Sequence, residues 1–77
     1  MPTNVQFLAN FIARNPGCTP VQARRALCAF NEKEYHRGYY TGYTSGIKYV
    51  GSRAQYPYWV NFEGGLYITE LGLTKRV

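Results

Sequence analysis

The stretch FEGGLYITELG, from Phe62 to Gly72, does most to define the fold of this chain. It follows an apolar segment, YWVNF, and its glycine pair separates that segment from a second one, LYIT. Glycine between two short runs of β-branched and aromatic residues is typical of a β-hairpin, because glycine adopts the positive φ angles that tight turns need. The sequence therefore predicts two antiparallel strands near the C-terminus.

The register of this hairpin depends on which side chains it buries. A two-residue loop, Gly64-Gly65, pairs Phe62 with Tyr67 and mixes core and surface residues on each face. A three-residue loop, Glu63-Gly64-Gly65, pairs Phe62 with Leu66 and collects the apolar side chains on one face. That face consists of Tyr58, Val60, Phe62, Leu66 and Ile68. We expect the three-residue loop, with its final glycine at positive φ.

A first helix is expected over residues 4–14. Thr3 and Gln6 have the spacing of a capping box, in which each side chain bonds the backbone N–H of the other residue. The chain should leave the helix at Asn15-Pro16-Gly17, since proline disfavours helical geometry in the residue before it. The apolar stripe of this helix contains Val5, Phe7, Leu8, Ala9, Phe11 and Ile12.

A second helix is expected over about 20–30 and repeats the same signals. Thr19 and Gln22 form another capping box, and Pro20 occupies the first helical position, where its missing N–H costs nothing. Arg24 and Arg25 lie off the apolar stripe and should face solvent or a partner. The stripe consists of Ala23, Ala26, Leu27 and Phe30.

Residues 31–50, NEKEYHRGYYTGYTSGIKYV, fit two periods. Three glycines and many β-branched and aromatic residues favour a strand. A helical period separates the tyrosines from the polar side chains more cleanly, so we expect a helix over roughly 34–46. A tyrosine-rich strand remains the alternative.

The charge pattern favours a polyanionic partner. The net charge of +5 arises from nine Lys and Arg against four Glu. No acidic residue lies in residues 1–31 or 38–62. Neutralising phosphates releases counterions and gives affinity for any nucleic acid sequence.

Little in the sequence indicates catalysis or metal binding. The 77 residues are expected to form one domain, 1–77, too small for an enclosed active site. Cys18, Cys28 and His36 lack the close pairs of a structural zinc site. We expect no enzyme activity, catalytic residue, metal, cofactor or small-molecule substrate. Because no apolar run approaches the roughly 18 residues of a membrane span, and no secretory signal is seen, we expect a cytoplasmic protein without a membrane partner.

Two segments resemble winged helix-turn-helix DNA-binding domains. The run from Asn15 to Pro20, followed by QARRAL (22–27), is similar to the link between the first two helices of such domains. Leu66 to Gly72 is similar to the last strand of the wing. The order of two capped helices, a third expected helix and a C-terminal hairpin extends the resemblance over nearly the whole chain. The resemblance implies a small α+β fold, with three helices followed by a C-terminal hairpin wing.

In that family the third helix enters the DNA major groove and the wing touches the backbone or the minor groove. The resemblance thus implies a DNA-binding protein, of which transcriptional regulators of phage or mobile-element type are the expected kind. The partner would be double-stranded DNA, contacted by the basic and polar residues off the apolar faces. These residues are Arg24, Arg25, Arg37, Tyr40, Thr41, Thr44, Ser45, Lys48 and Arg53.

Other features favour a protein partner instead. The wing tip carries Glu63 where a basic residue would suit DNA, and the chain has eight tyrosines. Tyrosine, tryptophan and arginine are the usual anchors of protein–protein interfaces. The alternative is therefore a winged helix that binds and inhibits a host protein, or that pairs with a second copy of itself.

Overall fold

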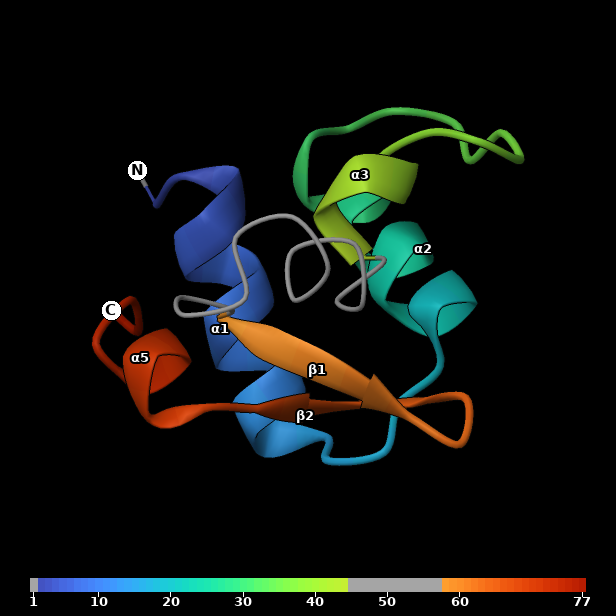
Figure 1. The fold of residues 1–77 in the computed structure, drawn as a ribbon. Helices are drawn as coiled ribbons and strands as arrows, with labels where there is room; N and C mark the ends of the chain where they lie inside the picture. Colours follow the sequence, from blue (N-terminus) through green and yellow to red (C-terminus); the bar gives the residue numbers. More distant parts are fainter. Residues whose placement is uncertain (1, 45–57) are drawn as a thin grey trace.

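The computed structural model in Figure 1 describes residues 2–44 and 58–77 as an α+β arrangement of helices around a small sheet. Helix α1 packs against α2, against strand β2 and against α5, and α2 also contacts α3. The element order is α1 (Asn4–Arg14), α2 (Pro20–Phe30), α3 (Thr41–Thr44), β1 (Trp59–Phe62), β2 (Gly65–Ile68) and α5 (Glu70–Leu73).

Both long helices have the bounds and the caps that the sequence predicts. At the start of α1, Gln6 N–H donates to Thr3 Oγ1 at 3.2 Å, and Thr3 N–H donates to Gln6 Oε1 at 2.8 Å. At the start of α2, the corresponding Gln22–Thr19 distances are 3.1 and 2.9 Å. Each box satisfies two backbone donors that a helix terminus otherwise leaves without a partner.

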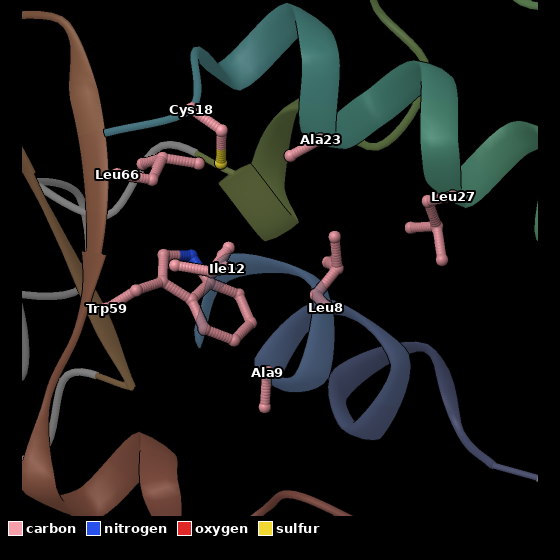
Figure 2. Packing of buried hydrophobic residues seen from close by; sticks show 8 residues of the cluster. All are labelled: Leu8, Ala9, Ile12, Cys18, Ala23, Leu27, Trp59 and Leu66. Carbon is pink, nitrogen blue, oxygen red and sulfur yellow. The ribbon is translucent and has the colours of Figure 1, made fainter. Parts of the chain in front are cut away.

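One apolar core lies between α1, α2 and the hairpin (Figure 2). On α1, Leu8, Ala9 and Ile12 are fully buried, as the helical stripe predicts. The remaining buried members of the cluster come from the link after α1, from α2 and from the two strands. They are Cys18, Ala23, Leu27, Trp59 and Leu66.

The buried face of α2 is rotated slightly from the predicted one. Ala23 and Leu27 are buried as expected, but Cys28 is 1% exposed, whereas Ala26 and Phe30 are only half-buried. Phe30 instead stacks on Phe7 of α1, with 4.4 Å between ring centroids. The Cys28 side chain is thus buried on α2, while the Phe30 ring packs at the partly buried edge of the core.

The predicted hairpin register is wrong. Phe62 pairs with Gly65 and Trp59 with Ile68, so the loop contains two residues, Glu63 and Gly64. Their φ angles are +51° and +85°, as a type I′ turn requires. The single apolar face expected from Tyr58 to Ile68 is therefore not formed, because this register turns Trp59 inward and leaves Phe62 62% exposed.

Gly65 has a different role from the one expected of it. The positive φ belongs to Gly64, whereas Gly65 is buried where two backbone segments meet. A Cβ at this position would lie 2.9 Å from the carbonyl oxygen of Gly17. Glycine is needed here because it allows close backbone approach.

That close approach adds a third segment to the hairpin. Gly17 N–H donates to the Leu66 carbonyl at 2.9 Å, and Leu66 N–H donates to the Cys18 carbonyl at 2.8 Å. The link between α1 and α2 thus forms an antiparallel bridge with β2. Strand β2 consequently lies between this link and β1.

The helix expected over 34–46 is wrong for most of its length. Residues 33–36 have no regular structure, residues 37–40 form turns, and α3 spans only Thr41–Thr44. The φ angles of Gly38 and Tyr40 are +108° and +60°, which a right-handed helix cannot contain. Residues 45–46 lie outside the described residues.

The short helix α5 was not anticipated from the sequence. Thr69 caps its start, and its Oγ1 accepts from the Gly72 N–H at 3.1 Å. The same Thr69 hydroxyl donates to the Tyr58 carbonyl at 3.0 Å. This residue therefore joins the beginning of α5 to the open end of the hairpin.

Candidate nucleic-acid interface

The expected DNA contacts divide between α2 and the segment from Arg37 to Thr44. Ser45, Lys48 and Arg53 lie outside the described residues. The other members do not share one exposed face, because some of them point into the protein.

Arg24 is half-buried and connects α2 to α3. Its Nη1 donates to Thr44 Oγ1 at 3.1 Å. Its Nε is buried and has no hydrogen-bond partner among the described residues. The sequence predicts that Arg24 faces solvent or a partner, whereas the structure shows its side chain half-buried and bonded to Thr44.

Arg25, the next residue, is exposed. Its guanidinium carbon lies 5.0 Å from the centroid of the Tyr35 ring. A cation–π contact of this kind orients the arginine without removing its charge from solvent. Arg25 is thus available to a phosphate.

Tyr40 and Thr44 lie inward, contrary to their expected place on a groove-facing surface. Thr44 is completely buried, and the Tyr40 ring packs against the core. The Tyr40 hydroxyl accepts from Asn31 Nδ2 at 3.2 Å. These two side chains therefore anchor α3 to the rest of the protein. They point inward because the positive φ of Tyr40 turns the chain just before the helix.

Arg37 and Thr41 are exposed, as predicted. Arg37 lies in a turn closed by the Tyr39 N–H, which donates to the His36 carbonyl at 3.0 Å. Thr41 Oγ1 donates to the Gly38 carbonyl at 2.7 Å. The turn presents Arg37 to solvent close to the start of α3.

The structure also brings together basic and aromatic residues outside the expected set of DNA contacts. Lys33 Nζ lies 5.9 Å from the centroid of the Tyr39 ring, and His36 packs edge-on against the same ring. The alternation of basic and aromatic letters in KEYHRGYY was the available signal. We call this set the cation–aromatic surface: Arg25, Lys33, Tyr35, His36, Arg37 and Tyr39.

The hairpin differs from this surface because its charge is negative. Glu63 is the only charged residue between Tyr58 and Thr69. Beside it, Phe62 and Tyr67 are 62% and 40% exposed, and their rings meet in a T-shaped pair at 6.4 Å. The expected wing tip is therefore acidic and aromatic, which does not favour phosphate.

Neither cysteine is arranged as a reactive thiol. Cys18 and Cys28 are free and buried, and burial raises the pKa of the Cys18 thiol above its ordinary value. In the described part of the chain, no three His, Cys, Asp or Glu side chains come together as metal ligands. No helix within the described ranges has the length and hydropathy that crossing a membrane requires.

The contrast between the two neighbouring arginines gives a test of their roles. Replacing Arg24 with alanine should lower the free energy of unfolding by about 1–2 kcal/mol, because the hydrogen bond to Thr44 and the packing of the side-chain stem are lost. The matched Arg25→Ala change should alter it by no more than about 0.5 kcal/mol. Urea denaturation of both variants measures the difference, and equal losses would contradict these assignments.

These features define a small α+β protein whose α2–α3 connection exposes cations and aromatic rings. Comparisons with known protein families, curated proteins and solved structures find no match to the chain.

Proposed function

We propose that the protein binds double-stranded DNA through the basic side chains around α3. The observation that carries this proposal is the exposure of Arg25 on α2 and of Arg37 just before α3, a short helix that the Arg24–Thr44 hydrogen bond joins to α2. The net charge of +5 adds a general attraction to polyanions. A winged helix arrangement is part of the proposal and is supported by the order of two capped helices, a third helix and a hairpin.

Contacts to phosphates would supply most of the affinity. Thr44 and Tyr40 are occupied inside the protein, which leaves Arg37 and Thr41 as the described α3-side groups that can reach base edges. Phosphate contacts position a protein on the duplex, whereas base contacts give it sequence preference. We therefore propose strong salt dependence and a modest sequence preference. Regulation of transcription is the use that the winged-helix resemblance implies.

The decisive experiment is an anisotropy titration of a labelled random 20-base-pair duplex at several salt concentrations. The protein should bind with a steep salt dependence. The double change Arg25→Ala with Arg37→Ala should weaken binding to all sequences alike and reduce the slope of log K against log salt by about two.

A matched control removes the same charge elsewhere. Lys75→Ala with Arg76→Ala acts beside the C-terminus, which lies far from α3 in Figure 1. The salt slope of this control should stay close to that of the unchanged protein. If the protein does not bind the duplex at low salt, or if the two double variants weaken binding equally, the proposal that this surface binds DNA is wrong.

A second function, protein binding through the hairpin, rests on a separate observation. Phe62 and Tyr67 form an exposed aromatic pair next to Glu63, a surface suited to a protein and unsuited to phosphate. Under this alternative the protein inhibits a host protein or pairs with itself. A Phe62→Ser change would then abolish capture of that partner and leave duplex binding unchanged.

A further inference from the structure

We propose that the cation–aromatic surface also binds single-stranded DNA, by stacking unpaired bases on Tyr39 and His36. The proposal goes beyond duplex binding, because the bases of an intact duplex already stack on one another. Proteins that hold single strands combine exposed aromatic rings with nearby positive charge. Both features occur together in this part of the described chain.

Tyr39 and His36 lie at the two ends of one backbone turn. The Tyr39 N–H donates to the His36 carbonyl at 3.0 Å, and Gly38 supplies the positive φ of +108° that the turn uses. The rings meet edge to face, with 5.4 Å between centroids and 65° between planes. They are therefore not stacked on each other, but Lys33 lies over the Tyr39 ring and the Tyr40 ring lies 5.8 Å from it at an interplanar angle of 32°. A base that stacks on Tyr39 would take the place of one of these side chains.

The rings are also accessible. Tyr39 is 43% exposed, and His36 is exposed beside it. Figure 1 shows the connection between α2 and α3 looping outward, away from the hairpin.

Positive charge lies against one of the two rings that would take the bases. Lys33 Nζ is 5.9 Å from the Tyr39 centroid. A base stacked on Tyr39 would bring its own phosphates close to Lys33. The charge and the ring would thus bind neighbouring parts of the same nucleotide.

Charge alone does not account for this surface. Glu32 and Glu34 are exposed in the same connection and reduce the attraction to phosphate that Arg25, Lys33 and Arg37 provide. Stacking supplies affinity that does not depend on net charge. The aromatic pair on the hairpin differs in this respect, because only Glu63 carries charge there.

The test compares two tyrosines of nearly equal exposure, Tyr39 at 43% and Tyr67 at 40%. The probe is a labelled 20-nucleotide oligothymidylate, which cannot pair with itself. Tyr39→Ala should weaken binding to this strand about tenfold, as expected for the loss of one stacked base. Tyr39→Phe keeps the ring and should bind as the unchanged protein does. Tyr67→Ala should also leave the affinity unchanged.

Each variant is titrated with the random duplex as well, and thermal unfolding checks that it folds. Loss of strand affinity in Tyr39→Ala, with duplex affinity within about twofold, would support stacking. If the unchanged protein does not bind the oligothymidylate, or if Tyr39→Ala and Tyr67→Ala behave alike, the inference is overturned while duplex binding can still stand. Binding of the strand through Tyr39 without any duplex binding would keep the inference and overturn the proposed function.

Discussion

A Trp59→Ala variant should lose about 3–5 kcal/mol of unfolding free energy, the usual cost of deleting a large aromatic side chain from a core. Trp59 is 2% exposed and lies between Leu66 and the buried side chains of α1 (Figure 2). A protein of 77 residues has a total stability of only about 4–12 kcal/mol. The loss is therefore at least about a quarter of the total stability, and the variant should unfold at a clearly lower temperature and urea concentration.

Trp59 also has a polar role that a smaller change can isolate. Its Nε1 donates to the Tyr43 carbonyl at 2.8 Å and so ties β1 to α3. Trp59→Phe keeps much of the apolar volume and removes the donor, which should cost about 1–3 kcal/mol. In this variant, α3 should separate from β1 at a lower urea concentration than the one that unfolds the whole protein.

Phe62 provides the matched control in the same strand, since it is 62% exposed. Phe62→Ala should cost less than about 1 kcal/mol. Urea denaturation followed by circular dichroism measures all three variants. A loss from Phe62→Ala as large as that from Trp59→Ala would mean that the predicted register, with Phe62 inward, is the correct one.

The parts of the fold that could be predicted from the sequence are those fixed by local signals. Thr3 and Thr19 begin their helices through side chains that bond within the same turn. The spacing of Leu8, Ala9 and Ile12 requires only that one face of α1 be buried. No distant residue is needed to decide either feature.

The register of the hairpin, in contrast, could not be predicted from local signals. Counting apolar residues favoured a face with Val60 and Phe62, but burial of Trp59 outweighs it because its side chain carries more area and a donor with a specific acceptor. The turn also places Glu63 at positive φ, a conformation that sequence rules assign to glycine. The hairpin could be predicted, whereas its register depends on α1 and α3.

The candidate site was predictable only in part, for a related reason. Arg24 and Arg25 are adjacent and both lie off the apolar stripe, so the sequence treats them alike. The partner that separates them is Thr44, twenty residues further along the chain. Its approach to α2 depends on the positive φ of Tyr40, which the helical period does not indicate. Arg25, Arg37 and Thr41 are exposed, as the sequence predicts, but Arg37 lies in a turn and not on the expected helix.

Gly72→Ala should have the second large effect, a loss of about 2–4 kcal/mol of unfolding free energy. A Cβ at this position would overlap the carbonyl oxygen of Tyr58 and would lie 2.7 Å from Ile68 Cδ1. The Tyr58 carbonyl cannot move away freely, because it accepts from both the backbone N–H and the hydroxyl of Thr69, at 3.1 and 3.0 Å. Accommodating one methyl group therefore requires α5 to separate from the hairpin or these hydrogen bonds to break.

Gly42 is the matched control, since it is also a glycine in a short helix. A Cβ at Gly42 would meet no atom of the described residues within 4 Å. Gly42→Ala should leave stability unchanged or raise it by up to about 1 kcal/mol, because alanine has the higher helix propensity. Thermal and urea unfolding of the pair separate close packing from propensity. If both variants were equally stable, the contact of α5 with Tyr58 would not be tight in solution, and Thr69 would not join α5 to the hairpin as the structure shows.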